Sequence, residues 1–478
     1  MSRLSWARAG RLLRALAAAA ALVSGSSRTG FAESVVGSGT TGPNRLIVQN
    51  GFGFWAVINS NVPKISYSAD GINWSAPADI FSAGAEANIV SAADMYYVAK
   101  TSTVYIAAPP TASAAGDNGY IVRGELTGPG IPTFDEGPIS FSCTINGRIT
   151  ISRGDGQHSL TVTEDASGNP MSVWWVIDGN RNSGGRDFTL VVKASPGSAG
   201  VPPSRQTCNG RDEGGTSRAN HPVVTQLNAA GDVVVLYKFP RSGSIRWYAY
   251  SVAPANSNIN KSVATMTPNS EFPNNTARTA SAITAPNMTK HFTLIDGNGA
   301  LRWGRAVGGT ASAGTAAFAS NPAWTWVVIE AAGAVPLQNP SIGLSDYTTA
   351  GDSGSAYIVY KGNGDILNYA TGTTLDSAPS WAVTTPWLNV DDLGSWMPSI
   401  TQTNAAPIPP RVVFSSATQT EVHFETIFTS PPPVLTSISD SDGAPTSGGI
   451  GSGYDGRATR LVTVTGTGMT DFLNGPTL

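Results

Sequence analysis

The amino-acid sequence predicts an all-β protein, because one pattern of two apolar strands around a polar turn recurs seven times along the chain. The clearest copies pair residues 356–360 with 365–369 and residues 233–237 with 244–248. The other copies begin near Phe54, Val104, Val173, Phe292 and Val412. These starts are about 50–70 residues apart, which is typical of four-stranded propeller blades. We therefore expect a seven-bladed β-propeller. Six blades are the alternative, because the copy at Val104 is irregular.

Each expected blade needs an inner strand before its hairpin, and short apolar segments supply the candidates. These candidates are residues 88–90, 159–162, 221–224, 340–342 and 398–400. Proline at or just before such a strand is tolerated, because it need not donate a ladder hydrogen bond there. Large rings that fill the space between blades mark the expected outer strands. They are Trp74, Trp324, Trp326, Trp381 and Trp387.

The first 32 residues have the features of an export signal. Arg3, Arg8 and Arg11 form a positive segment before a short apolar core at residues 15–23, and Gly30 and Ala32 place small side chains where a signal peptidase reads. The apolar core is too short to span a bilayer. We expect residues 1–32 to be a signal peptide and the protein to be secreted or held at the cell surface, with another kind of arginine-rich leader as the alternative.

Composition indicates a folded, mildly acidic protein. Hydrophobic residues make up 41% of the 478 residues, enough for a buried core, and charged residues make up only 13%. The net charge of −3 includes five arginines in the leader, so the rest of the chain carries about −8. An acidic body does not attract nucleic-acid phosphates, so we expect no nucleic-acid partner. We also expect no membrane-spanning segment and no metal site, because the four histidines lie far apart in the sequence.

The chain has two cysteines, Cys143 and Cys208, which flank the third expected blade. An even number of cysteines in an exported protein favours one disulfide. The intervening loops are long and polar, and loops of this kind benefit most from closure. Two buried free thiols are the alternative.

Three consecutive prolines at residues 431–433 form a stiff linker and suggest a domain boundary. We expect a propeller over residues 33–430 and a second module over 431–478. Residues 434–438 and 460–466 alternate like strands around a Thr-Ser-Gly-Gly turn at 446–449. This pattern resembles the opening of an IPT/TIG immunoglobulin-like domain, although the segment after the turn is longer than that pattern expects. Such a sandwich needs about 80–100 residues, so we expect a partial domain.

One short motif in the first expected blade has a physical rationale. It contains Ser68, Asp70, Gly71 and Trp74, where a carboxylate holds a tight turn, glycine supplies a positive φ and tryptophan anchors the following strand. The motif resembles the Asp-box of sialidases and related BNR propellers, one residue shorter. That resemblance implies a structural turn on the face away from the active site. The family's first substrate arginine would correspond to Arg45, which here lacks the flanking aromatic and proline, so we expect Arg45 to be a surface residue.

Charged residues gather in loops that a propeller would bring to one face, around the mouth of the channel near blades three and four. Arginine forks suit carboxylate, sulfate or phosphate groups, so we expect a binding recess for an acidic glycan there. The expected ligand-binding residues are Arg181, Arg186, Asp187, Arg211, Asp212, Glu213, Arg218, His221 and Arg241. Arg153, Asp155 and His158 lie in the loop before the third inner strand. Solvated loops whose charges pair with one another are the alternative.

Together these observations predict an exported carbohydrate-binding or adhesion protein without catalytic activity or cofactors. Its expected partners are acidic glycans or surface glycoconjugates. We cannot locate the sialidase family's other arginines, its Tyr–Glu nucleophile pair or its acid by motif. A divergent sialidase-like glycoside hydrolase is one alternative, and a structural surface spacer without a small ligand is another. Strongly shifted carboxylate pKa values at the rim would favour the enzyme.

Overall fold

The computed structural model describes the greater part of residues 34–426 and two short segments after them. The described ranges are 34–42, 44–90, 92–111, 118–145, 148–150, 158–180, 187–212, 220–241, 244–252, 264–265, 280–296, 298–306, 324–331, 333, 337–345, 354–362, 366–373, 379–389, 398–401, 403–404, 410–415, 420–426, 434–439 and 463–467. These residues form antiparallel sheets with almost no helix, as the sequence predicts. The chain divides into two compact units, of which the larger covers residues 33–429.

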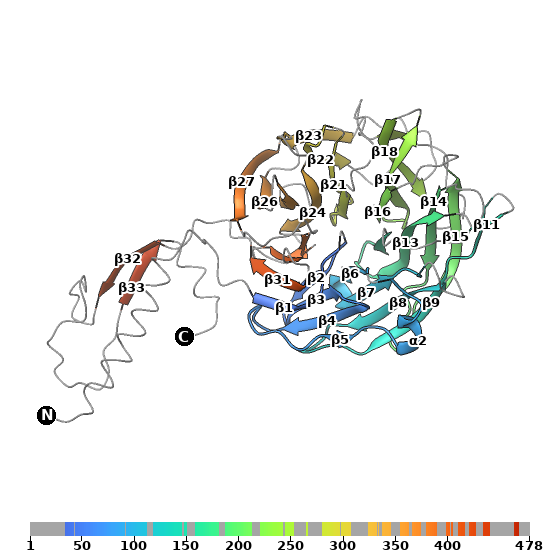
Figure 1. Ribbon diagram of the computed structural model, residues 1–478, viewed down its shortest axis with the longest axis horizontal. Helices are drawn as coiled ribbons and strands as arrows, with labels where there is room; N and C mark the ends of the chain where they lie inside the picture. Colours follow the sequence, from blue (N-terminus) through green and yellow to red (C-terminus); the bar gives the residue numbers. More distant parts are fainter. Residues whose placement is uncertain are drawn as a thin grey trace, which may run out of the picture. The chain divides into compact units, whose positions relative to one another are not determined.

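The larger unit is a β-propeller, with sheets arranged around a ring (Figure 1). The first blade contains β2 (Ile47–Asn50), β3 (Gly53–Asn59), β4 (Pro63–Ser68) and β5 (Ala78–Asp79). The second contains β6 (Asp94–Val98), β7 (Thr103–Ala108), β8 (Asn118–Glu125) and β9 (Phe134–Ser140). The third contains β12 (His158–Glu164), β13 (Pro170–Asn180), β14 (Asp187–Ala194) and β15 (Arg205–Asp212).

The next three blades follow the same order of strands. The fourth contains β16 (Asn220–Gln226), β17 (Val233–Arg241), β18 (Ser244–Val252) and β19 (Ala264–Thr265). The fifth contains β20 (Ala280–Thr284), β21 (Lys290–Ile295), β22 (Leu301–Ala306) and β23 (Trp324–Glu330). The sixth contains β24 (Gln338–Ser345), β25 (Ser355–Lys361), β26 (Ile366–Thr373) and β27 (Ser380–Asn389), and β29 (Thr403–Asn404) pairs in parallel with β24.

A further sheet, of four strands, joins the two ends of the propeller. It contains β28 (Ser399–Ile400), β30 (Arg411–Ser415) and β31 (Glu421–Thr426), and its outer strand is the N-terminal β1 (Ser34–Ser38). Six blades are therefore built from consecutive strands. The closing sheet combines strands from both ends of the propeller, and it is the seventh sheet of the ring in the described part. The remaining elements are α2 (Ala83–Glu86), η1 (Ala99–Thr101), β10 (Cys143–Ile145) with β11 (Arg148–Thr150), and β32 (Val434–Ser439) with β33 (Thr463–Thr467) in the other unit.

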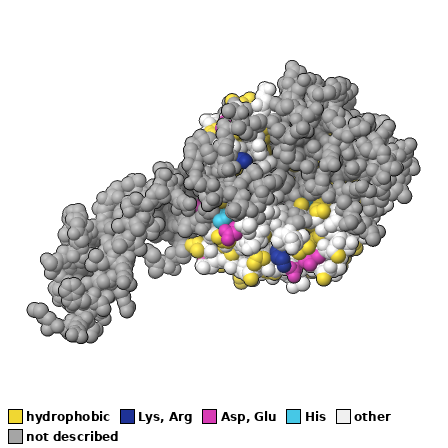
Figure 2. Space-filling model, viewed as in Figure 1, with side chains coloured by type: hydrophobic (Ala, Val, Ile, Leu, Met, Phe, Trp, Pro, Cys, Tyr) yellow, Lys and Arg dark blue, Asp and Glu magenta, His cyan; other side chains and the backbone are white. Residues whose placement is uncertain are grey.

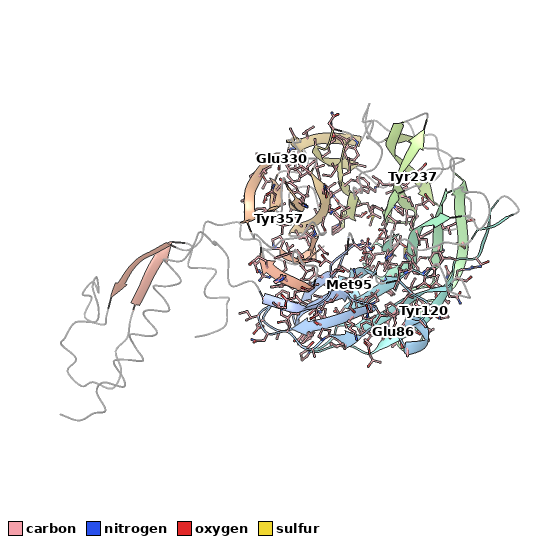
Figure 3. All side chains as sticks on the ribbon, in the orientation of Figure 1. Glu86, Met95, Tyr120, Tyr237, Glu330 and Tyr357 are labelled. Atoms are coloured by element: carbon pink, nitrogen blue, oxygen red, sulfur yellow. The ribbon has the colours of Figure 1, made fainter. Side chains whose placement is uncertain are left out.

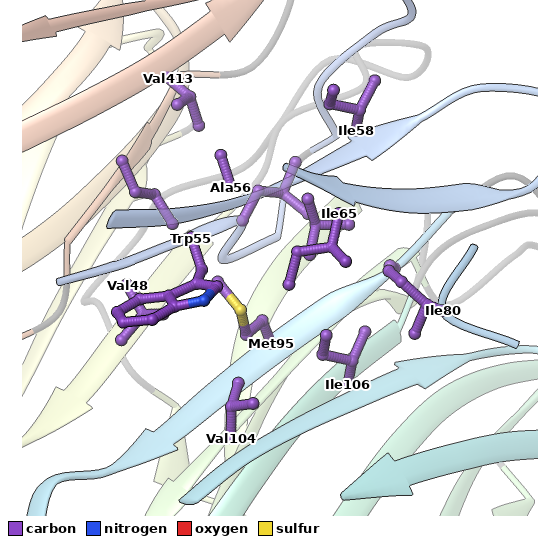
Figure 4. Packing of buried hydrophobic residues seen from close by; sticks show 14 of the residues in the cluster. Val48, Trp55, Ala56, Ile58, Ile65, Ile80, Met95, Val104, Ile106 and Val413 are labelled. Atoms are coloured by element: carbon purple, nitrogen blue, oxygen red, sulfur yellow. The ribbon is translucent and has the colours of Figure 1, made fainter. Parts of the chain in front are cut away.

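The strands form because apolar and β-branched residues fill both faces of each blade. Every residue of β3 and β7 is buried, since each blade is packed between two others. Side chains occupy the spaces between neighbouring sheets throughout the ring (Figure 3). One cluster takes Trp55, Met95 and Val413 from the first blade, the second blade and the closing sheet (Figure 4). Burial between blades therefore holds the ring together.

A hydrogen bond recurs between neighbouring inner strands. In each instance a side-chain oxygen in one inner strand accepts a backbone N–H that lies in, or directly before, the next inner strand, over 2.6–3.3 Å. The acceptor and donor pairs are Asp94 with Leu160, Ser159 with Val224, Ser281 with Ile342, Ser341 with Ile400, and Ser399 with Leu46. The last pair links the closing sheet to the first blade. These bonds join neighbouring blades through their inner strands.

Two sequence expectations about strands are wrong. The inner strand of the second blade is β6, because Ile89 of the expected segment 88–90 forms only an isolated bridge with Pro110. Trp74 lies in the turn between β4 and β5 rather than on an outer strand. The inner strands expected within 159–162, 221–224, 340–342 and 398–400 are present as parts of β12, β16, β24 and β28.

Candidate functional site

The backbone brings five of the nine predicted ligand-binding residues to one end of two adjacent blades. Asp187 begins β14, Arg211 and Asp212 end β15, His221 follows the first residue of β16, and Arg241 ends β17. Neighbouring strands of a blade are antiparallel, so all these positions lie at the end where the inner strands begin. We call this end of the propeller the rim face. The other four predicted residues, Arg181, Arg186, Glu213 and Arg218, lie outside the described residues, as do Arg153 and Asp155.

Arg45 is not a surface residue, contrary to the sequence expectation. It lies just before β2, is only 7% exposed, and forms a two-pronged ion pair with Asp94, the first residue of β6. Its Nε donates to Asp94 Oδ1 at 3.1 Å, and its second terminal nitrogen donates to Oδ2 at 2.8 Å. The guanidinium also lies over the ring of Tyr96, 5.3 Å from the centroid. That expectation was based on the missing flanking aromatic and proline, and the carboxylate partner of Arg45 is 49 residues away along the chain, where no local pattern indicates it.

Asp94 connects three blades through a single carboxylate. Besides the guanidinium of Arg45, it accepts the backbone N–H groups of Arg45, Met95 and Leu160 at 2.9, 3.0 and 2.6 Å. Hydrogen bonds from this many donors restrain the carboxylate in position. All of them come from the protein itself, so Asp94 joins the blades.

His158 is a buried, neutral residue rather than a charged rim group as the sequence suggested. It begins β12 and is 2% exposed, and this burial lowers the pKa of its imidazole to about 4, against the opposing effect of the Asp94 charge. Trp175 Nε1 lies 3.1 Å from His158 Nδ1. An indole N–H can only donate, so Nδ1 must be the unprotonated acceptor and the ring carries its proton on Nε2. Protonation of Nδ1 would set two donors against each other.

Glu164, at the far end of β12, is the one carboxyl of the described residues whose pKa is strongly raised. Burial raises the pKa to about 7, with a smaller contribution from Asp165, and the hydrogen bond from Tyr96 opposes the change. The Tyr96 hydroxyl donates to Glu164 Oε1 at 3.3 Å. The side-chain amide of Gln226 pairs with the backbone N–H and C=O of Glu164 at 2.9 and 2.7 Å. This group lies at the end of β12 opposite the rim face.

The Asp-box-like turn lies between β4 and β5, the third and fourth strands of the first blade. Burial disfavours the charge of Asp70, but hydrogen bonds from Asn73, Ile72 and Ser68 outweigh it and lower the pKa to about 2. Gly71 has a φ of 77°, which favours glycine. The turn has no part in the rim face, which is at the other end of the blade.

This turn also holds the N-terminal strand. The Ser34 hydroxyl of β1 donates to the carbonyl of Gly71 at 2.6 Å and accepts from Trp74 Nε1 at 3.1 Å. The Trp74 ring packs edge-on against Phe424 of β31, with centroids 5.3 Å apart. The motif therefore stabilises the junction between the first blade and the closing sheet.

Strand β10, which carries Cys143, contacts β15, which carries Cys208. This proximity is compatible with the expected disulfide, which stays a prediction. Within the described residues, no group of three or more His, Cys, Asp and Glu could hold a metal ion. In the same part of the chain, the helices are too short or too polar to cross a membrane. The coloured surface in Figure 2 carries scattered charged side chains, among them few lysines and arginines.

Sequence reasoning missed Asp94, Tyr96 and Glu164. A signal for the first was present, since Pro340-Ser341-Ile342 and Pro398-Ser399-Ile400 repeat a short acceptor before an apolar residue. Asp94 before Met95 occupies the corresponding place in β6. Tyr96 and Glu164 have no such signal, because only the neighbouring packing of β6 and β12 brings them together.

No protein-family model matches the chain. No curated protein matches it either. Among solved structures, an ulvan lyase bound to a GlcA–Rha3S repeat has a TM-score of 0.45 and 9% identity, covering 84% of this chain and 95% of the lyase. An α-L-arabinofuranosidase of Fusarium graminearum with arabinobiose has a TM-score of 0.42 and 13% identity, covering 70% and 92%. The Aleuria aurantia lectin with α-methyl-L-fucoside has a TM-score of 0.42 and 8% identity, covering 72% and 94%. These values do not assign an activity to the chain.

Proposed function

We propose that this protein binds carbohydrate at the rim face of blades three and four, without catalysis. The observation that carries the proposal is the meeting of Asp187, Arg211, Asp212, His221 and Arg241 at one end of two neighbouring blades. In a chain with only 13% charged residues, that concentration is unusual. Arginine forks pair with carboxylate or sulfate groups, so an acidic glycan is the proposed ligand.

The electrostatics of the neighbouring inner strands favour binding over catalysis. The carboxylate oxygens of Asp94 accept five hydrogen bonds from the protein itself. His158 is neutral and fixed by Trp175. Glycoside hydrolysis generally needs two carboxyl groups that face each other across the sugar. The carboxyl with the raised pKa, Glu164, lies at the opposite end of its strand.

The test is a glycan array probed with the purified protein, in which each spot is also checked by mass for loss of sugar. We expect binding to acidic glycans that remain intact. The double variant Arg211→Ala/Arg218→Ala should abolish binding, whereas Lys64→Ala, on the first blade, should not change it. Unchanged binding by the double variant, with its circular dichroism spectrum intact, would refute the placement. Spots that lose sugar would show a hydrolase or lyase, and a blank array would leave a structural spacer as the better account.

We also propose that the protein is exported and that Cys143 and Cys208 form a disulfide. What supports the disulfide is the contact between β10 and β15. Peptide mass mapping with and without reductant tests it directly, and two alkylatable thiols in the native protein would exclude it. N-terminal sequencing of secreted protein should find a start at Glu33.

A further inference from the structure

Glu164, the last residue of β12, lies where blades two, three and four meet. Its carboxyl accepts a hydrogen bond from the hydroxyl of Tyr96 on β6 at 3.3 Å. Its backbone N–H and C=O pair with the Gln226 side chain of β16 at 2.9 and 2.7 Å. The hydroxyl of Thr284 on β20 donates to the Gln226 carbonyl at 2.7 Å, which extends the chain of contacts to the fifth blade. One residue thus connects its own blade to both neighbours.

The surroundings of the Glu164 carboxyl suit the neutral acid better than the carboxylate. Among the described residues, it has no ion-pair partner, and Tyr96 is its one side-chain hydrogen-bond partner. Tyr105 of β7 stands opposite Tyr96 on the same face of the second blade, and burial raises the pKa of its hydroxyl against the opposing effect of Arg123. Asp165, the next residue, adds a like charge. A carboxylate here would be partly buried with one long hydrogen bond.

The nearby cations do not balance such a charge. Arg45 is bound to Asp94 beneath the Tyr96 ring. Arg123 of β8 is bound to Glu125 at 2.7 Å and lies 3.6 Å from Asp135. The exposed Lys100 of η1 packs its aliphatic stem near Gly168. A Cβ added to Gly168 would lie 3.2 Å from the Lys100 Cβ and 3.7 Å from Glu164 Oε2.

We propose that Glu164 is a proton-sensitive latch between blades two and three, whose joint is more stable when the Glu164 carboxyl is protonated than when it is ionised. The raised pKa of about 7 supports this assignment. Between the ordinary pKa of 4.5 and about 7, the folded state holds a proton that the unfolded state has lost, so stability falls as pH rises across this window. The full change in the unfolding equilibrium constant is about 300-fold.

The test is urea unfolding of the purified protein from pH 4 to pH 8, compared with Glu164→Gln. We expect the wild type to lose stability relative to this variant as pH rises from 4.5 to 7, by up to about 300-fold in the unfolding constant. The control Glu125→Gln, an exposed carboxyl on β8, should keep the wild-type profile. Parallel profiles for the wild type and Glu164→Gln would overturn the proposal.

A second variant keeps the test decisive if Glu164→Gln does not fold. The Tyr96 hydrogen bond favours the charged form, so Tyr96→Phe should move the loss of stability to higher pH. A midpoint that stays in place or moves to lower pH would count against the latch. These profiles do not involve a ligand, so failure of the latch leaves glycan binding untouched, and the reverse also holds.

Discussion

The ion pair between Arg45 and Asp94 allows a sharp test of how the ring is held. Asp94→Asn replaces one carboxylate oxygen by a donor. If the amide nitrogen takes the Oδ2 position, the N–H of Leu160 and the terminal nitrogen of Arg45 lose their acceptor. If it takes the Oδ1 position, the losses are the backbone N–H and Nε of Arg45 and the N–H of Met95. In either case the buried guanidinium of Arg45 keeps only one of its two hydrogen bonds to residue 94.

Removing one partner of a buried pair costs about 3–5 kcal/mol, because the remaining charge stays buried without compensation. We therefore expect Asp94→Asn to lower the free energy of unfolding by about 3–5 kcal/mol. The assay is equilibrium unfolding in urea at pH 7, followed by tryptophan fluorescence and circular dichroism. The matched control is Asp79→Asn, which breaks the exposed pair with Lys64 and should cost less than about 1 kcal/mol.

Two outcomes would refute the reasoning. A cost for Asp94→Asn as small as that for Asp79→Asn would mean that the buried pair does not hold the blades. The double variant Arg45→Met/Asp94→Asn gives the other check. It removes the buried guanidinium, while the amide oxygen at position 94 can still accept backbone N–H groups, so it should be more stable than Asp94→Asn. If it were less stable, the loss would come from packing rather than from an uncompensated charge.

Three further predictions concern the turns and the start of β12. Ser34→Ala leaves the Trp74 indole and a carbonyl without their partner, so it should cost about 1–3 kcal/mol in urea unfolding, and Trp74→Phe should add little to it. Met288 has a φ of 64°, a left-handed conformation that glycine adopts without strain. Met288→Gly should therefore raise the melting temperature, because relief of about 1–2 kcal/mol of strain exceeds the entropic cost of glycine. A lower melting temperature for this variant would contradict the prediction. His158→Phe removes the acceptor of Trp175 and should cost about 1–3 kcal/mol at pH 7, whereas an unchanged unfolding midpoint would exclude a role for that bond.

The repeated fold was predictable because blades are local structures. Each hairpin, such as β25 with β26, joins residues close in sequence, so strand periodicity and turn residues suffice to find it. The second inner strand was misplaced because residues 88–90 and 94–98 are both short and apolar. Only the acceptor role of Asp94 toward Leu160 of the next blade distinguishes them.

The chemistry of buried groups was not predictable for a different reason. The pairing of Arg45 and the ionisation of His158 and Glu164 depend on partners 49 to 114 residues away along the chain, or on burial between two blades. A single sequence shows that a residue is charged but not whether it faces water. Charge concentration therefore indicated a rim, while His158 and Glu164, whose pKa values are strongly shifted, lie on the inner strand β12.

The two titratable ends of β12 oppose each other in their effect on stability. The folded pKa of His158 lies near 4, below its ordinary 6.5, so its contribution to stability is lost as pH falls through this range. The contribution of Glu164 is lost as pH rises from 4.5 to about 7. Their windows overlap and their signs differ, so these two groups together should give the wild type a nearly flat profile between about pH 4.5 and 6.5. His158→Phe should then unmask stability that falls with rising pH, and Glu164→Gln should unmask the opposite slope. If both single variants kept the wild-type slope, neither residue would change ionisation with folding, and the flat profile would need another cause.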